Sequence, residues 1–290
     1  MEQTRVKFIG YWFMVMAALL CSCSSDDDNT PQDDNSGRRM RQLTISNVSM
    51  NTRATIAPST YAVTWATTDR PTYINLSEQP ELHYGTLIPS TAEASTTLTG
   101  SVYCKQGDNI AIVLPTVTPV LPSGGTLSFP INLSGQKGTL ADIGARYHYI
   151  YGVGTVTSTD GGTATGTISN TKSLLSLCKF TFTNGDEPVN VKSLQIGWGT
   201  GGASGYPQTG TVSLANPASV SAEAGDPSGP LTVTLDEPNA EGVVYVALFP
   251  CSDKLTFHFT VSDGKNTYTA TKNAKMLEGK YYEVPVAFNP

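Results

Sequence analysis

Four residues at the end of an apolar run carry the clearest chemistry in this sequence: Leu20, Cys21, Ser22 and Cys23. A bacterial lipoprotein signal ends in a small residue directly before the cysteine that receives the lipid. Cys23 fits this pattern, because Ser22 precedes it and Leu20 lies three residues before it. Cys21 follows two leucines and fits poorly. The sequence therefore predicts that Cys23 is lipidated and is residue 1 of the mature chain.

The segments on either side of Cys23 agree with this prediction. Arg5 and Lys7 precede the apolar run 8–20, which has the length of a signal-peptide core and is too short to span a bilayer. The polar and acidic residues that follow cannot bury apolar surface, so they read as a solvated tether. We predict a signal peptide over 1–22 and a tether over 23–42. An ordinary secreted protein cut nearby is the alternative.

The tether also carries a Ser/Asp-rich stretch directly after Cys23. Such a stretch resembles the signal that sends lipoproteins of Bacteroidetes-type bacteria to the outer face of the outer membrane. This resemblance predicts a chain held at the cell surface by the lipid on Cys23. The alternative is a plain flexible spacer.

Catalytic chemistry is hard to find elsewhere in the chain. The three histidines, His83, His148 and His258, belong to no metal-binding or nucleophile motif, and the carboxylates do not pair as a glycoside hydrolase requires. We therefore expect no enzyme, no cofactor and no metal site. The net charge of −6, with no strongly basic cluster, argues against a nucleic-acid partner.

Three cysteines remain beyond the N-terminal pair: Cys104, Cys178 and Cys251. An odd number does not make a disulfide framework. Cys178 and Cys251 lie in apolar, strand-like runs and are expected to be small core residues. One pair can bridge in an oxidising compartment, and the sequence does not decide which.

Aromatic residues offer two candidates for ligand contact. In a strand predicted over 145–156, Tyr147, Tyr149 and Tyr151 fall on one face. Such a face packs a core or a domain seam, or it stacks on sugar rings, and both interpretations stay open. The second candidate is Trp198, in the Gly-rich stretch 197–202, which we interpret as a loop or edge strand that exposes the indole.

The rest of the chain alternates short apolar runs with turn residues. The first patterned strand, 43–50, changes parity at Asn47, which predicts a β-bulge there. Asp160-Gly161, Asn184-Gly185 and Asp263-Gly264 are strong hairpin signals. This pattern predicts an all-β chain of antiparallel sandwiches with a helical turn near 172–177 only. We place a domain boundary near 170, giving domains 43–170 and 171–290. After 43–50, the expected strands are 60–66, 95–103, 109–114, 125–133, 145–156, 163–169, 177–183, 189–197, 209–214, 230–236, 242–249, 254–262, 266–272 and 281–288.

Several short motifs, in order along the chain, resemble one family. They are the lipoprotein signal and acidic tether, a first strand followed by Thr52-Arg53-Ala54-Thr55, then Val63-Thr-Trp65, the segment 173–182 and the closing strand 277–286. Together they resemble the fimbrillin family of Bacteroidales, the subunits of type V pili. The resemblance implies two antiparallel Greek-key, transthyretin-like β-sandwich domains in tandem.

The same resemblance implies a function and a processing site. Fimbrillins reach the surface as lipoproteins, and a secreted Arg-specific protease then cuts after an arginine behind the first strand. Arg53 matches that position, whereas Arg41 and Arg39 precede the predicted strand and fit less well. Loss of strand 43–50 would leave a groove that a strand of another pilus subunit fills, and the roles of stalk, tip and anchor stay open. The strand 281–288 is either the donor or the last strand of a terminal subunit. The alternative function is a monomeric surface lipoprotein that binds a glycan or a host protein.

Overall fold

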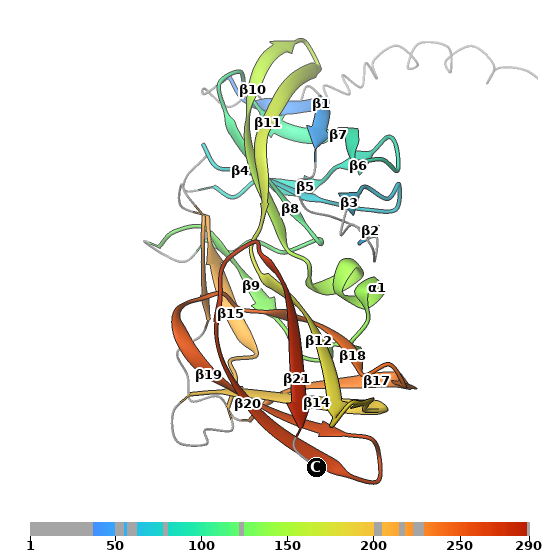
Figure 1. The fold of residues 1–290 in the computed structure, drawn as a ribbon. Helices are drawn as coiled ribbons and strands as arrows, with labels where there is room; N and C mark the ends of the chain where they lie inside the picture. The colour runs from blue at the N-terminus through green and yellow to red at the C-terminus, as the bar shows by residue number, and fades with distance from the viewer. Residues whose placement is uncertain are drawn as a thin grey trace, which may run out of the picture.

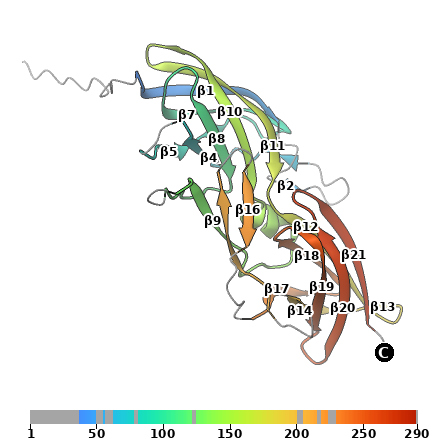
Figure 2. The same cartoon turned by 90° about the vertical axis from the view of Figure 1, so that its left-hand side faces the viewer.

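The computed structural model describes residues 37–49, 55–56, 63–77, 81–121, 125–199, 205–214, 218–222 and 229–288. The described residues form an elongated, almost entirely β structure, which confirms the predicted all-β class (Figures 1 and 2). The predicted lipidation site Cys23 and processing site Arg53 lie outside the described residues, as do the signal peptide and most of the tether.

The regular elements are strands of 2 to 12 residues and one short helical segment. In chain order they are β1 (Arg39–Ser49), β2 (Thr55–Ile56), β3 (Val63–Thr64), β4 (Thr72–Asn75), β5 (Tyr84–Thr86), β6 (Ile88–Pro89), β7 (Ser95–Cys104), β8 (Asn109–Leu114), β9 (Ser128–Asn132), α1 (Leu140–Asp142) with a π-helical turn (Ile143–Tyr147), β10 (Ile150–Asp160), β11 (Thr163–Ser173), β12 (Ser176–Asn184), β13 (Glu187–Pro188), β14 (Val191–Trp198), β15 (Thr209–Ser213), β16 (Ser219–Ala222), β17 (Leu231–Asn239), β18 (Val243–Leu248), β19 (Cys251–Ser262), β20 (Thr267–Met276) and β21 (Tyr281–Phe288).

An eight-stranded sheet makes up the N-terminal half, in the order β5-β4-β8-β10-β11-β1-β7-β6. One face contributes Leu43, Ile45 and Ile112 to a smaller core. The other face contributes Ile74 and Val113 to a larger core shared with the C-terminal half. Strands β4 and β8 are therefore buried on both faces, whereas β1, an interior strand of the same sheet, buries one face and exposes the other.

The C-terminal half contains the sheet β17-β14-β19-β20 and a second sheet around β12. In that second sheet β21 runs parallel to β12, just as β1 runs parallel to β11. Because β11 and β12 are nearly continuous, the first and last described strands both lie along one ribbon. These two parallel pairs depart from the purely antiparallel arrangement that the sequence predicts.

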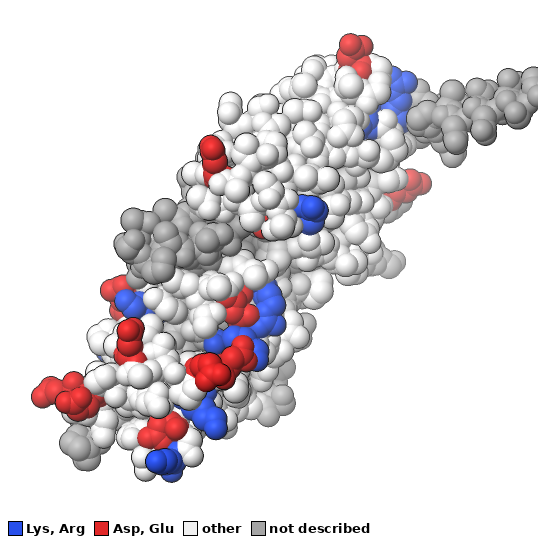
Figure 3. All heavy atoms as spheres, turned by 90° about the vertical axis from the view of Figure 1, so that its right-hand side faces the viewer, with Lys and Arg blue, Asp and Glu red and all other residues white. Residues whose placement is uncertain are grey.

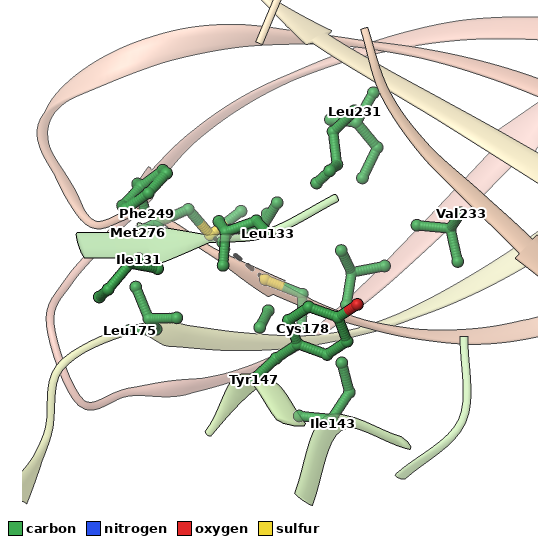
Figure 4. Close-up of a cluster of buried hydrophobic side chains, with 14 of the residues drawn as sticks. Ile131, Leu133, Ile143, Tyr147, Leu175, Cys178, Leu231, Val233, Phe249 and Met276 are labelled. Atoms are coloured by element: carbon green, nitrogen blue, oxygen red, sulfur yellow. Dashed lines mark hydrogen bonds between the residues drawn. The ribbon is translucent and has the colours of Figure 1, made fainter. Parts of the chain in front are cut away.

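Residues before position 170 also enter the C-terminal half. Strand β9 pairs with β15, and the two form a three-stranded sheet with β16. Figure 4 shows Ile131, Leu133 and Tyr147 packed in one cluster with Cys178 and Phe249. Pairing and packing therefore cross the predicted boundary, and the two tandem sandwich domains remain a prediction.

The predicted turns and bulge are confirmed where the structure describes them. Asn47 has a φ of 56°, and the pairing of β1 with β7 shifts between Ile45 and Val48. Gly161, Gly185 and Gly264 have positive φ in the turns that join β10–β11, β12–β13 and β19–β20. Asparagine and glycine tolerate this left-handed conformation better than other residues, which is why they mark such positions in the sequence.

Two predictions of secondary structure are wrong. Residues 145–147, predicted as the start of the strand 145–156, belong to a π-helical turn, and 172–177 contains no helix. Thr139 caps α1 by accepting a hydrogen bond from the Asp142 backbone N–H, and Asp142 pairs with Arg146 four residues later. These local contacts stabilise one short helical segment, whereas the alternating tyrosines in the sequence favour the prediction of a strand.

Candidate functional site

The candidate site is β1 together with the strands and loops that hold it. Side chains of β1 alternate in exposure, so Leu43 and Ile45 are buried while Met40 is 44% exposed. After the bulge at Asn47, Val48 returns to the buried face. The bulge therefore keeps the whole strand facing the smaller core.

Both edges of β1 are paired. Residues 39–49 run antiparallel to β7, and residues 42–45 run parallel to β11. Figure 1 shows β1 beside β7 at one end of the molecule, with the β10–β11 ribbon next to it. Removing β1 would leave two unpaired edges and an open strip of the core, which are costly features in any sheet.

Residues that follow β1 in the sequence also contact it. Trp65, which is 2% exposed, donates a hydrogen bond of 3.0 Å from Nε1 to the carbonyl oxygen of Val48. Thr171 donates from Oγ1 to the carbonyl oxygen of Ser49 at 3.0 Å. The C-terminal end of β1 is therefore hydrogen-bonded to side chains from two later parts of the chain.

The N-terminal end of β1 is held by an ion pair. Arg38 donates from Nε and Nη2 to the two carboxylate oxygens of Asp108, each at 2.8 Å. Asp108 is 1% exposed and also accepts hydrogen bonds from Asn75 and from the backbone N–H of Lys105. Burial opposes ionisation of Asp108, but these hydrogen bonds, that from Arg38 first, outweigh it and hold its pKa below the ordinary value.

The two alternative processing sites lie within β1. Arg41 is 8% exposed and donates to the carbonyl oxygen of Cys104, while Arg39 donates to that of Gly161 at 2.8 Å. The prediction that these arginines belong to a tether ending at 42 is therefore wrong. Their side chains have partners in the fold, so β1 begins four residues earlier than the apolar pattern indicates.

The predicted aromatic platform does not form. Tyr147, Tyr149 and Tyr151 are 4%, 9% and 5% exposed, and all three belong to the larger core. Tyr147 donates its hydroxyl hydrogen to the carbonyl oxygen of Ser134 at 2.7 Å. Of the two interpretations that the sequence left open, core packing fits these positions, because a buried ring offers no face to a ligand.

Trp198 also lies differently from its prediction. It ends β14, which is an interior strand between β17 and β19. Its ring is partly buried and contacts Tyr206 and Phe257, with centroids 4.7 and 6.1 Å apart. The prediction of an exposed indole is therefore wrong, because the glycines around Trp198 mark the end of a core strand rather than an exposed edge.

The three cysteines beyond the N-terminus are free thiols in the structure. Burial raises the pKa of Cys104 to about 11 and raises that of Cys178 further. Cys178 lies 3.6 Å from the Met276 sulfur, a contact drawn as a dashed line in Figure 4. Two of the three, Cys104 and Cys178, therefore serve as buried apolar side chains.

Charged groups of the two signs are mixed on one face of the molecule. On the face shown in Figure 3, Lys and Arg alternate with Asp and Glu. Lys137–Asp236 and Lys172–Glu278 are ion pairs of 2.6 Å in the described chain. The described residues contain no group of three side chains placed to hold a metal ion. In the same part of the chain, no helix is long and apolar enough to cross a membrane.

The ion pair at the start of β1 could not be predicted from the sequence. The only local sign of it is the run Arg38-Arg39-Met40-Arg41, and this run looks like a basic patch in a linker. Its partner Asp108 is 70 residues away. No local pattern connects the two, because the pairing depends on how β1 lies against the β7–β8 turn.

Comparison with known proteins gives structural neighbours only. No protein-family model and no curated protein matches the sequence. A solved structure described as a "putative cell adhesion protein" from Bacteroides ovatus matches at a TM-score of 0.53 and 12% identity, covering 87% of this chain and 94% of that one.

Two other neighbours show weaker structural similarity. A protein with the same description from Bacteroides fragilis has a TM-score of 0.44 and 14% identity, covering 85% of this chain and 92% of that one. The tip fimbrial protein Mfa3 from Porphyromonas gingivalis has a TM-score of 0.42 and 10% identity, covering 87% and 96%. The chain thus has the fold of the Bacteroides ovatus protein. The three neighbours named are Bacteroidales proteins described as "putative cell adhesion" or fimbrial proteins, in line with the resemblance to fimbrillins.

Proposed function

We propose that this protein is a structural or adhesive subunit of a cell-surface pilus, assembled by protease-triggered exchange of β1. In this proposal the chain is exported as a lipoprotein, anchored to the outer membrane through Cys23. A secreted Arg-specific protease then cuts after Arg53, and a strand of another subunit takes the place of β1. The observation that carries the proposal is the interior position of β1 between β7 and β11.

The position of the proposed cut supports this order of events. In the sequence, Arg53 falls after the end of β1 and before the start of β2 at Thr55. A cut there separates all of β1 from the rest of the fold. Cuts after Arg39 or Arg41 would fall inside a paired strand, where a protease cannot reach the backbone without unfolding it first.

The energetics explain why the vacated site needs a new occupant. Leu43, Ile45 and Val48 are each 1% exposed or less. Burying one such side chain is worth about 1.5 to 3 kcal/mol, so the three together contribute roughly 5 to 9 kcal/mol. This is comparable with the whole stability of a typical domain, about 5 to 15 kcal/mol. A strand from a neighbouring subunit can restore both the apolar contacts and the backbone pairing.

Head-to-tail filling of such a groove does not close on itself, so it produces a filament. The test is therefore assembly. Arg53→Ala should abolish SDS-resistant ladders on the cell surface. Arg70→Ala should leave them unchanged, because Arg70 is exposed and its side chain donates to the nearby carbonyl oxygens of Thr67 and Asp69. Ladders that persist in Arg53→Ala would refute the proposal and favour a monomeric lipoprotein that binds a glycan or host protein.

A further inference from the structure

A buried carboxylate lies at the end of the β1 site, in the turn between β7 and β8. The side chain of Asp108 is 2% exposed, and that of Arg38, its charged partner, is 12% exposed. Next to this pair, Arg41 donates to the carbonyl oxygen of Cys104, the last residue of β7. The N-terminal end of β1 therefore brings two guanidinium groups, three residues apart, to one turn of the sheet.

The proposed strand exchange, on which this inference rests, would separate the partners of Asp108. Arg38 and Arg41 precede Arg53 and would leave with β1. The side-chain amide of Asn75 and the backbone N–H of Lys105 would stay, and both are neutral donors. A buried carboxylate that loses its hydrogen-bonded guanidinium is strongly destabilised. After β1 leaves, Asp108 therefore lacks a positively charged partner, and an incoming strand that supplies one is favoured.

We propose that the strand that replaces β1 comes from a subunit with a different sequence, not from a second copy of this chain. That strand carries two basic residues three positions apart, and the first of them pairs with Asp108. Two apolar residues at alternate positions follow the second basic residue, as Leu43 and Ile45 follow Arg41. Arginine fits the first position better than lysine, because its two donors match the two carboxylate oxygens. The carboxylate thereby fixes the register of the incoming strand, since a slip of one residue would take the basic side chain away from Asp108 and turn the apolar side chains away from the core.

Strand β21 of a second copy does not meet this requirement. If Lys280, which directly precedes β21, lay opposite Asp108, then Glu283 would fall at the second basic position. Pro285 would fall at the first apolar position, where an interior strand needs a backbone N–H. Moving Lys280 to the second basic position would instead put Leu277 opposite Asp108. In its own sheet β21 pairs only with β12, and Pro285 is tolerated there.

The test uses the full-length chain with residues 50–54 replaced by the recognition sequence of a site-specific protease. After the cut, fluorescent peptides compete for the site and their affinity is measured by anisotropy. The probes are the β1 peptide 37–49, its Arg38→Gln and Arg39→Gln variants, and the β21 peptide 279–288. Arg39→Gln is the matched control, because it removes the same charge from a side chain whose contact is solvent-exposed.

The Arg38→Gln peptide should bind about a hundredfold more weakly than the unchanged peptide, and the Arg39→Gln peptide within about threefold of it. In an Asp108→Asn chain the difference due to Arg38 should disappear. Equal binding of the unchanged and Arg38→Gln peptides, or equal binding of the β21 peptide, would overturn this inference and leave strand exchange intact. If β1 stayed bound after the cut and no peptide entered, the proposed function itself would fail, and this inference with it.

Discussion

Ile45 provides the sharpest test of how firmly β1 is packed. Its side chain is 1% exposed, and its neighbours across the sheet are Leu98 on β7 and Gly166 on β11. Truncation of a buried isoleucine to alanine costs about 2 to 5 kcal/mol, depending on how far the cavity collapses. Gly166 has no side chain to move into the space, so we expect a loss of about 3 to 4 kcal/mol in Ile45→Ala. For a chain of this size, that loss lowers the Tm by roughly 6 °C.

The measurement is urea denaturation followed by the fluorescence of Trp65, which lies in the same core as Ile45. A Trp198→Phe background in a chain without residues 1–22 makes Trp65 the only tryptophan, since the remaining one is Trp12. Met40→Ala is the matched control: it shortens a long side chain of the same strand that is 44% exposed, and should change stability by less than about 0.5 kcal/mol. If Ile45→Ala were no more destabilising than Met40→Ala, the packing of β1 described above would be wrong.

Three further predictions concern the sheet around β1. Because Asn47 has a φ of 56°, Asn47→Val should lower the free energy of unfolding by about 1 to 2 kcal/mol and Asn47→Gly should not, as urea denaturation will show. A Cβ at Gly154 would collide with the carbonyl oxygen of Thr167, so Gly154→Ala should yield little folded protein by circular dichroism, while Gly162→Ala, which has open space, should fold normally. The pKa of Asp108 is below its ordinary value of 3.8 in the folded state, so the unfolded chain binds the extra proton first as the pH falls. The stabilisation from Asp108 is therefore complete above pH 3.8 and is lost on acidification below it. When the free energy of unfolding is measured at a series of pH values, Asp108→Asn should lack this part of the pH dependence. If the pH dependence of the variant matched that of the unchanged chain, the lowered pKa of Asp108 would be contradicted.

Much of the strand pattern could be predicted from the sequence, because strand periodicity and turn chemistry are local. The strands predicted at 109–114 and 281–288 coincide with β8 and β21, and the bulge at Asn47 lies where the apolar parity changes. Turns at Asp160-Gly161 and Asp263-Gly264 follow from the ease with which glycine adopts positive φ.

What the sequence did not predict depends on long-range contacts. The pairing of β9 with β15 joins residues about 80 positions apart, and no periodicity encodes it. Arg38 and Arg41 resemble linker residues until Asp108 and the Cys104 carbonyl are placed beside them. The short strands β4 and β5 could not be predicted for a related reason, because they pair for only a few residues. All four residues of β4 are buried, so β4 shows no alternation, and β5 is largely exposed.

The N-terminus of the native protein is the most direct test of whether β1 is released by a cut after Arg53. Intact-mass measurement and N-terminal sequencing should be applied to protein taken from filaments on the cell surface. If β1 is released, the chain begins at Ala54 and carries no lipid. A filament subunit that begins at a lipid-bearing Cys23 would retain β1 and would contradict this release.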